Sequence, residues 1–203
     1  MTNRPIRAIR GERVYLRPLE PGDAELIHHW FEDARVHTLM GDLPRSLAWR
    51  RQSAEEAAKD DGRDVFRFII CQLVDDRPIG RTDLFEIDRT NGSAALGITI
   101  GEPALWGRGL GTDAVNALVD LAFGQLRMER VWLDTDADNA RAQAAYTKAG
   151  FSREGILRHA WFQDGHWSDD IRMSLLRDEW AALPRRKSWE RVEAAIAERS
   201  ADE

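Results

Sequence analysis

The first sixty residues carry short apolar runs separated by polar segments. Residues 14–16 form an apolar run that ends before Pro18, which predicts a short strand. Asp23 stands where a helix N-cap is expected, and the apolar positions that follow predict a helix through Trp30. Residues 48–59 predict a second helix with a largely polar surface. This part of the chain therefore predicts one strand followed by two helices.

Residues 65–100 have the β-rich and alternating pattern of strands rather than helical spacing. Apolar runs at 65–74, 79–87 and 94–100 are separated by two turn signals, one at 75–78 and one at the Asn-Gly pair 91–92. Three strands at such close spacing predict an antiparallel meander.

Helical spacing returns after Gly101. Apolar residues recur with a helical period over 111–126, which predicts an amphipathic helix. A strand at 131–133 and a helix at 139–149 follow, and Gly150 is a typical residue to end that helix. Two more strands are predicted at 151–161 and 167–176, and a short helix at 189–196. This order predicts an α+β (mixed α/β) fold in a single domain over 1–203, with a C-terminal helical tail at 183–203.

Composition narrows the classes of protein that this fold can represent. The 203 residues are 43% hydrophobic and 32% charged, which excludes global disorder. The net charge of −6 argues against non-specific binding of nucleic acid or anionic lipid, and no apolar run has the length of a membrane span. The single Cys71 excludes a disulfide framework and is expected to be a buried apolar residue. We expect a cytoplasmic protein, with the N-terminal arginines on a solvated arm.

The strongest local signal is a glycine-rich segment at the start of the helix 111–126. Gly107, Gly109 and Gly111 alternate with other residues in the run WGRGLGT at 106–112. Because glycine has no Cβ, a ligand can approach the backbone N–H groups, and the helix dipole favours an anion there. Arg108 adds a cation at the same place. The segment predicts a phosphate site, with a tight turn that binds nothing as the alternative.

Two kinds of phosphate ligand fit this segment. Gly109, Gly111 and Ala114 satisfy the dinucleotide pattern G-x-G-x-x-A, and Asp134 follows near where a ribose-binding acid would lie. That pattern requires a strand that runs directly into the glycines, whereas Pro103 intervenes here. The other ligand is the pyrophosphate of coenzyme A, bound between a strand and a helix.

A second motif favours coenzyme A. The run NARAQAAYTKAGF at 139–151 closely resembles the N-x-R-A/S-x-x-x-Y-x-K-x-G-F signature of the GNAT N-acetyltransferase superfamily. With LGITIG at 96–101 and the glycine-rich run, the chain resembles the ribosomal-protein-acetyltransferase (RimJ/RimL-like) branch over about residues 11–182, the expected acetyltransferase core. The resemblance implies a GNAT fold, in which a mixed, mostly antiparallel sheet splays between its middle strands and is flanked by helices.

The resemblance also implies the co-substrate and its contacts. Acetyl-CoA would be the donor, its pyrophosphate held by backbone N–H groups of the glycine turn and its pantetheine arm lying in the splay. A main-chain N–H there would polarise the thioester carbonyl. Asn139 would contact the pantetheine arm, although it could equally serve only as the N-cap of its helix. The residues implied in cofactor binding are Ile98, Thr99, Ile100, Arg108, Gly109, Leu110, Gly111, Thr112, Asn139 and Lys148.

Tyr146 occupies the family position that assists the leaving CoA thiolate. A tyrosine is a weaker acid than a thiol, so hydrogen bonding in step with C–S cleavage is expected rather than complete proton transfer. The other interpretation is a packed tyrosine whose hydroxyl caps a backbone group. Ala142 replaces a serine of some family members, so a serine-dependent step is not available. Glu102 is the expected catalytic base and Asp83 an alternative, and each is also compatible with a surface carboxylate.

The acceptor is expected to be a primary amine on a small molecule or peptide, bound by residues 23–64 and the hairpin 161–167. Acidic side chains could attract the amine, and tryptophan side chains could line its site through cation–π contact. The candidates are Glu32, Asp33, Asp42, Asp60, Asp61, Trp30, Trp49, Trp161 and Trp167.

We expect no metal, and we expect the chain to form a homodimer. Two other functions stay open, a catalytically inert acyl-CoA-binding module on the same fold and, less favoured, a nicotinamide-cofactor oxidoreductase.

Overall fold

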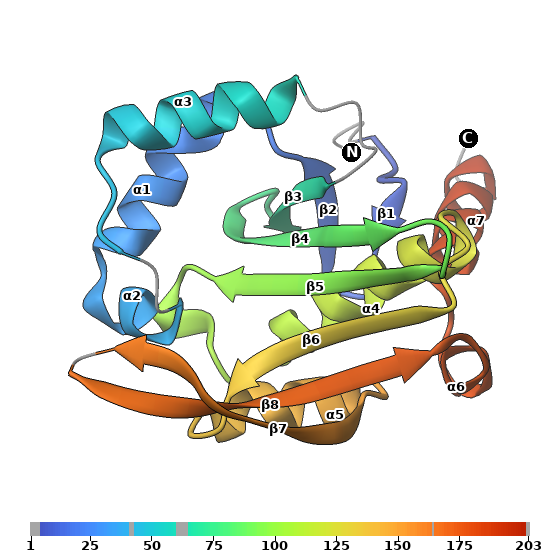
Figure 1. Cartoon of the computed structure of the whole chain (residues 1–203). Coiled ribbons are helices and arrows are strands. Elements are labelled where there is room, and N and C mark those ends of the chain that lie inside the picture. The colour runs from blue at the N-terminus through green and yellow to red at the C-terminus, as the bar shows by residue number, and fades with distance from the viewer. Residues whose placement is uncertain (1–4, 41–42, 60–64, 164, 202–203) are drawn as a thin grey trace.

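One mixed sheet runs through the molecule, with helices on both of its faces (Figure 1). The computed structural model describes residues 5–40, 43–59, 65–163 and 165–201. The strands, in chain order, are β1 (Ile9–Arg10), β2 (Val14–Pro18), β3 (Phe66–Gln72), β4 (Pro78–Asp88), β5 (Ser93–Ile100), β6 (Arg130–Asp136), β7 (Ser152–Gln163) and β8 (His166–Leu176). The α-helices are α1 (Ala24–Glu32), α2 (Ala34–Met40), α3 (Leu47–Ala58), α4 (Leu110–Gly124), α5 (Ala140–Lys148), α6 (Arg177–Ala182) and α7 (Ser188–Ala201).

The sheet has the order β1-β2-β3-β4-β5-β6-β8-β7 and is mostly antiparallel, as predicted. The antiparallel β3–β4 and β4–β5 pairs confirm the meander at 65–100. β5 and β6 are parallel, because α4 connects them as a crossover helix. Their pairing covers only Ser93–Ala95 against Arg130–Trp132, although β5 continues to Ile100. The two strands therefore part beyond Ala95, and this gap is the splay that the resemblance implies.

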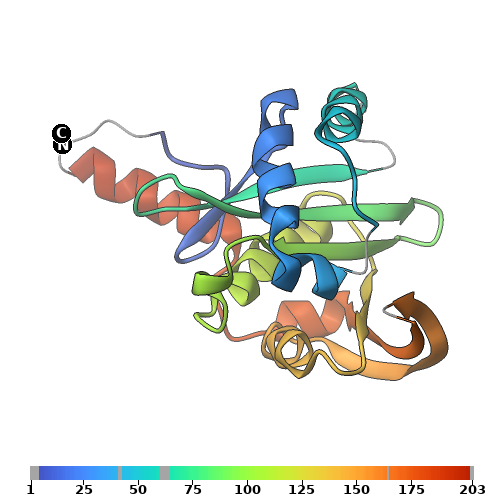
Figure 2. The ribbon, with the colours of Figure 1, turned by 90° about the vertical axis from the view of Figure 1, so that its left-hand side faces the viewer.

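The two faces of the sheet are covered differently. On the α4 face, α4, α5 and the strands enclose the larger apolar core, in which Leu84, Leu118 and Leu175 are fully buried. On the opposite face, here called the α1 face, a smaller cluster centres on Trp30 and Ile69. The alternation of side chains along β2 and β3 supplies both cores. Figure 2 shows α7 extending on the side of the molecule away from α3.

Three short elements and the hydrogen bonding of one cap residue differ from the prediction. The sequence pattern does not predict β1, α2 or α6, because each is too short to display a recognisable hydrophobic period. Asp23 is the N-cap residue of α1, as predicted, but its side chain forms no cap hydrogen bond with that helix. Its carboxylate instead accepts hydrogen bonds from Arg17, at 2.8 and 2.6 Å, and from the backbone N–H of Glu20 at 2.8 Å. This pairing ties β2 to the start of α1.

The C-terminal tail is held by one buried carboxylate. Asp120 in α4 is 2% exposed and accepts hydrogen bonds from Trp180 Nε1 at 2.8 Å and from the Ser188 backbone at 2.7 Å. It also accepts two from Arg185, at 2.9 and 2.8 Å. The Ser188 hydroxyl in turn accepts the N–H of Arg10 at 2.9 Å. The tail, predicted as a helix at 189–196 and observed as α7, is thus bound to both α4 and β1.

Two expectations from composition concern Cys71 and membrane spans. Cys71 is a free, buried residue of β3, which confirms the expected apolar role. No helix within the described ranges combines the length and the hydropathy that crossing a membrane requires.

Candidate active site

The glycine-rich turn before α4 has the backbone conformation that its glycines permit. Gly107 and Gly109 have φ values of 72° and 79°, in the left-handed region that glycine adopts without strain. A Cβ at Gly107 would meet nothing within 4 Å, and one at Gly109 would lie 4.0 Å from Arg13. The backbone is therefore open to a ligand, and the first-turn N–H groups of α4 have no partner inside the helix. This geometry suits an anion.

Two arginines flank the turn, and one of them comes from the other end of the chain. Arg108 lies within the turn and is exposed. Arg13 donates from Nη1 to the carbonyl oxygen of Arg108 at 2.6 Å. It is held there because the carboxylate of Asp113, in the first turn of α4, accepts the backbone N–H groups of Glu12, Arg13 and Val14 at 2.9, 2.8 and 3.0 Å. Both guanidinium groups therefore add positive charge beside the turn.

Arg10, Arg13 and Arg17 thus do not belong to the solvated arm that was expected, and Arg4 lies outside the described residues. Arg13 meets the glycine turn, Arg17 pairs with Asp23, and the backbone of Arg10 binds Ser188. The sequence gives no indication of the part that Arg13 plays, because it depends on the β1–β2 turn lying against the start of α4. That contact joins residues about a hundred positions apart.

The splay between β5 and β6 lies beside the glycine turn. Ile98, Thr99 and Ile100 are on the part of β5 that has left β6. The two isoleucines pack against the larger core, whereas Thr99 points to the α1 face and is buried. Trp106, just before the turn, donates from Nε1 to the carbonyl oxygen of Ile100 at 2.8 Å. This bond fixes the end of β5 relative to the glycine turn.

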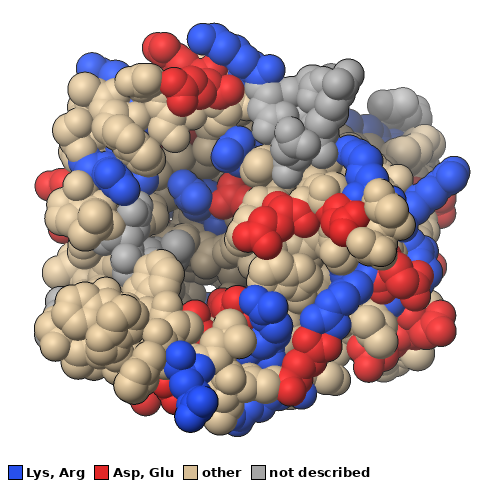
Figure 3. All heavy atoms as spheres, viewed as in Figure 1, with Lys and Arg blue, Asp and Glu red and all other residues tan. Residues whose placement is uncertain are grey.

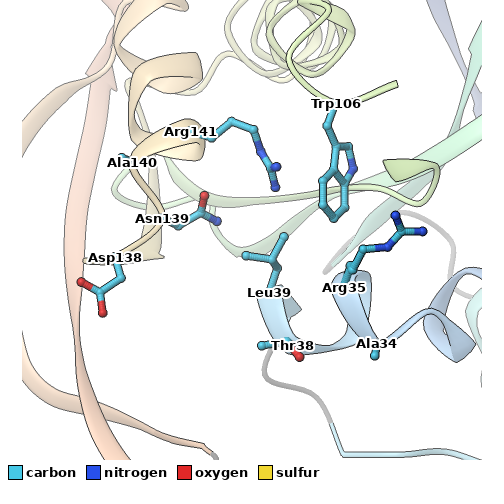
Figure 4. Close-up of a pocket in the computed structure, with 9 residues that line it drawn as sticks. All are labelled: Ala34, Arg35, Thr38, Leu39, Trp106, Asp138, Asn139, Ala140 and Arg141. Carbon is cyan, nitrogen blue, oxygen red and sulfur yellow. The ribbon is translucent and has the colours of Figure 1, made fainter. Parts of the chain in front are cut away.

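A pocket of about 610 Å³ opens between α2, Trp106 and the start of α5 (Figure 4). The guanidinium of Arg141 lies 4.0 Å from the centre of the Trp106 ring, which is cation–π distance. Leu39 of α2 faces these two groups across the pocket in Figure 4. The pocket is therefore open, with an aromatic and an aliphatic side chain on its walls and cations at its rim.

Asn139 is the N-cap of α5, which is one of its two expected roles. Its Oδ1 accepts the backbone N–H of Ala142 at 3.1 Å, so it is the N-cap of α5. It also lines the pocket, and Figure 4 shows its amide nitrogen turned toward the cavity. The cap thus uses the oxygen and leaves the amide nitrogen for a ligand.

Tyr146 lies on α5 and is 8% exposed. Its ring centre is 6.1 Å from that of Phe151, and burial raises the pKa of its hydroxyl to about 12. No described residue forms a hydrogen bond with this hydroxyl. The described residues therefore do not support the interpretation that the hydroxyl caps a backbone group. The neighbouring Ala145 carbonyl accepts from Thr112 Oγ1 at 3.5 Å, which brings α5 against the first turn of α4. Lys148, by contrast, is exposed at the end of α5.

The two candidate bases differ in their surroundings. Glu102 forms an ion pair with Arg77 at 2.9 Å, and Arg77 lies before β4, on the side of β5 away from the splay. Asp83 in β4 is 9% exposed and accepts from Arg81 at 3.0 Å through Oδ2. No described residue donates to its buried Oδ1. Glu102 is therefore paired with a cation, whereas one carboxylate oxygen of Asp83 has no hydrogen-bond donor among the described residues.

The acids expected around the acceptor mostly have partners or lie outside the described residues. Asp42, Asp60 and Asp61 are outside them. Glu32 lies 3.7 Å from His28. Asp33 pairs with Arg35, whose guanidinium lowers the pKa of that carboxyl to about 2.

The four tryptophans expected to wall the acceptor site fall into two groups. Trp30 is 2% exposed and packs against Gly101, so its role is in the core. Trp49 is 43% exposed, with the guanidinium groups of Arg45 and Arg50 within cation–π distance of its ring. Trp161 and Trp167, on the β7–β8 hairpin, are 41% and 57% exposed. Of the four, Trp49 and the hairpin pair therefore have the exposure that contact with an acceptor requires, and Trp30 does not.

A charged layer on the α1 face of β6 and β8 was not anticipated. Arg172 donates to Asp134 at 2.8 and 2.6 Å and lies 4.2 Å from the Trp132 ring centre. Asp136 and Asp170 are directly opposite each other, and burial followed by the charges of Asp134 and Asp136 raises the pKa of Asp170. The signal was present in the sequence, because Trp132, Asp134 and Asp136 alternate with buried residues along β6.

The dinucleotide interpretation fails at the junction it requires. A short 3-10 helix at Pro103–Leu105, followed by Trp106, separates β5 from the glycine turn. β5 therefore does not run directly into the glycines as a dinucleotide-binding strand does.

Comparison with known proteins agrees with this geometry. Residues 13–152 match the family model described as an acetyltransferase (GNAT) domain. The chain is 30% identical to spermidine N(1)-acetyltransferase of Escherichia coli (strain K12) over 170 residues, which cover 83% of this chain and 89% of that protein. It is 28% identical to N-acetyltransferase p20 of Bacillus licheniformis, over 84% of this chain and 96% of that protein.

A solved structure shows the same fold with ligands bound. Spermidine N-acetyltransferase from Vibrio cholerae in complex with CoA and spermine superposes with a TM-score of 0.76 at 26% identity. The match covers 83% of this chain and 98% of that one. With a splayed sheet, an open glycine turn and a matching family model over most of its length, the chain belongs to the GNAT acetyltransferase family.

Proposed function

We propose that the chain transfers the acetyl group of acetyl-CoA directly to a primary amine, with the thioester lying in the splay between β5 and β6. The observation that carries the proposal is the separation of this parallel pair after Ala95, directly beside a glycine turn with an open backbone. A parallel pair inside a sheet normally keeps its ladder, because unpaired backbone groups are costly. A ligand that lies between the strands would satisfy those groups.

In this proposal the donor is bound mainly by backbone. The N–H groups at Gly109, Leu110, Gly111 and Thr112 receive the pyrophosphate, and Arg108 supplies charge. The edge of β5 at Ile98, Thr99 and Ile100 receives the pantetheine arm, and a main-chain N–H there polarises the thioester carbonyl. Asn139 offers its amide nitrogen from the pocket, and Lys148 contributes charge from the surface of α5.

The amine must attack as the neutral species. An alkyl ammonium has a pKa near 10.4, so about one molecule in 2,500 is neutral at pH 7, a handicap of roughly 4.6 kcal/mol. The amine nitrogen bonds to the thioester carbon, the C–S bond breaks, and the sulfur leaves as a thiolate. Glu102 stays our candidate for accepting the amine proton, directly or through water. Its ion pair with Arg77 must rearrange or be bridged for that role.

Tyr146 is proposed to hydrogen-bond the leaving sulfur. Its pKa of about 12 keeps the hydroxyl protonated throughout the working range of pH, so it is always available as a donor. Because a tyrosine is a weaker acid than a thiol, it stabilises the developing thiolate without full transfer of its proton. Its freedom from other partners among the described residues supports this role.

The acceptor is proposed to be a small-molecule or peptide amine. Relatives named as spermidine acetyltransferases support a small aliphatic amine. The RimJ/RimL-like branch, which would favour a protein N-terminus, rests on the motifs and on a relative named as a ribosomal N-acetyltransferase. A homodimer and a cytoplasmic location likewise stay predictions.

Replacement of Tyr146 by phenylalanine tests the chemical role. We expect Tyr146→Phe to lower kcat by about 100-fold, while the KM for acetyl-CoA changes by less than about threefold, because the hydroxyl acts on the transition state. Release of free CoA thiol measures both constants. An unchanged kcat would remove Tyr146 from its role.

Calorimetric titration separates the competing functions. The proposal predicts binding of acetyl-CoA and no binding of NAD. NAD binding without CoA binding would support an oxidoreductase, and CoA binding without acetyl transfer to any amine would support an inert acyl-CoA-binding module.

A further inference from the structure

A buried carboxylate oxygen on the α1 face has no partner in the described part of the chain. Asp83 is 9% exposed, and its Oδ2 is held by Arg81 at 3.0 Å, whereas nothing there donates to Oδ1. An unsatisfied buried acceptor lowers the stability of the fold. Buried polar atoms in native proteins are satisfied in the great majority of cases. Oδ1 is therefore an acceptor for which the described part of the chain supplies no donor.

The neighbouring position on the next strand is a glycine. Gly97 in β5 is the direct partner of Asp83 in the β4–β5 ladder, so the two positions share one face of the sheet. A Cβ at Gly97 would have a single described neighbour within 4 Å, Phe85 Cε1 at 3.4 Å. The space above Gly97 is thus open and lies next to Asp83.

Gly97 also borders the splay. The last residue of β5 that pairs with β6 is Ala95, so Gly97 is two residues past the point where the strands part. It immediately precedes Ile98, where the segment proposed to meet the thioester begins. Figure 3 shows the same face hollowed between the α1–α2 helices and the β7–β8 hairpin, with basic and acidic atoms around the hollow. An acceptor can reach Gly97 from this side while the donor approaches from the glycine turn.

We propose that Asp83 Oδ1 accepts a hydrogen bond from the acceptor nitrogen, which occupies the space above Gly97. This inference rests on the proposed N-acetyl transfer and names the residue that positions its acceptor. Arg81 fixes the orientation of the carboxylate by holding its other oxygen. A primary amine meets the requirement because it presents an N–H to Asp83 and its lone pair to the thioester carbon. A tertiary amine has no N–H when neutral and would not fit.

The first test replaces Asp83 by asparagine, which keeps the shape and removes the charge. Five amines serve as probes, namely spermidine, spermine, lysine, glucosamine and a peptide with a free N-terminus, and the one with the highest kcat/KM is used. We expect Asp83→Asn to lower kcat/KM for that amine by at least about 30-fold, mainly through KM, because the nitrogen loses a charge-assisted hydrogen bond. The Kd for acetyl-CoA should stay within about twofold.

Glu86→Gln is the matched control, since Glu86 lies on the same strand, is exposed, and undergoes the same change of charge. It should leave kcat/KM within about twofold. Thermal unfolding of both variants shows whether Asp83→Asn is folded, and equal acetyl-CoA affinity shows that the donor site is intact.

A second variant tests the space rather than the charge. Gly97→Ala adds one methyl group that meets only Phe85 at ordinary contact distance, so the sheet should accept it. We expect the amine KM to rise by about tenfold with an unchanged Kd for acetyl-CoA, because the methyl occupies the nitrogen's position.

The outcomes separate this inference from the function on which it rests. If the wild type acetylates an amine but both variants keep its KM, Asp83 does not position the acceptor, and its Oδ1 binds an internal water instead. If the wild type acetylates none of the amines, the proposed function and this inference both fall. If Asp83→Asn loses acetyl-CoA affinity to the same extent as amine activity, the carboxylate is structural and the inference is wrong.

Discussion

The two faces of the sheet are built by different means. The α4 face is a continuous apolar core, and at its open end α4 presents backbone N–H groups behind a glycine turn. The α1 face carries a smaller apolar cluster and then charged side chains that pair across strands, among them Arg172 with Asp134 and Arg130 with Glu154. We thus expect acetyl-CoA to bind on the α4 face, where the binding site is shaped by backbone groups and buried packing. We expect the amine to bind on the α1 face, where the site is shaped by charged side chains.

This difference explains how one fold can keep a donor and change its acceptor. Backbone N–H groups are the same in every sequence, so the glycine turn needs only its glycines and the packing of α4. Cross-strand charges can be exchanged residue by residue without disturbing the core on the other face. Substitutions on the α4 face should therefore affect stability strongly and donor binding, whereas those on the α1 face should affect the acceptor and change stability only slightly.

The largest expected effect comes from the carboxylate that holds α4 to the tail. Asp120→Ala leaves the Arg185 guanidinium without its partner and removes the acceptor of Trp180 and Ser188. We expect the free energy of unfolding to fall by about 3–5 kcal/mol in urea titrations. Asp178→Ala, in an exposed first turn of α6, is the control and should change it by less than about 0.5 kcal/mol. Equal effects of the two would contradict the role of Asp120.

The next effect isolates the donor end of the α4 face. Gly109→Val forces a β-branched residue into a backbone with φ of 79° and covers the N–H groups behind it. We expect the Kd for acetyl-CoA, measured by calorimetry, to rise by at least about 30-fold. Gly155→Ala on β7, where a Cβ has open space, should leave it unchanged. Retained affinity in Gly109→Val would place the donor elsewhere.

The part of this site that could be predicted from sequence is the part made of local segments. The glycine turn, the N-cap at Asn139 and the position of Tyr146 each lie within a short run whose spacing carries the information. Arg13 and the open oxygen of Asp83 depend on contacts between distant strands and helices, so no local pattern reveals them. The N-cap position of Asp23 was predicted correctly, whereas the pairing of its carboxylate with Arg17 was not, because Arg17 lies on the preceding strand.

A smaller effect tests whether the arginine from the chain's N-terminal part belongs to the donor site. Arg13→Gln removes the exposed cation beside Gly109 and its bond to the Arg108 carbonyl. We expect about a fivefold rise in the Kd for acetyl-CoA, an effect that shrinks as salt is added because exposed charges are screened. Arg158→Gln, on exposed β7, should have no effect. A salt-independent loss in Arg13→Gln would indicate a purely structural role.

The smallest effect lies on the α1 face and depends on pH. The Arg130 guanidinium lowers the pKa of Glu154 from 4.5 to about 2, so its ionised form stabilises the fold above pH 4.5 and this contribution is lost as pH falls toward 2. Because the Glu154 side chain is 39% exposed, we expect only about 1 kcal/mol at pH 7. The difference in unfolding free energy between wild type and Glu154→Gln should shrink below pH 4.5. A difference that stays constant with pH would show that the ion pair contributes nothing.

The central claim is that this chain transfers the acetyl group of acetyl-CoA, bound on one side of the splay, to an amine bound on the other side. Release of CoA thiol from acetyl-CoA, followed with and without each amine of the panel, tests it most directly. We predict that at least one primary amine raises the rate of release at least about 100-fold over that with enzyme and acetyl-CoA alone. Binding of acetyl-CoA with no amine-dependent release for any of them would contradict the claim.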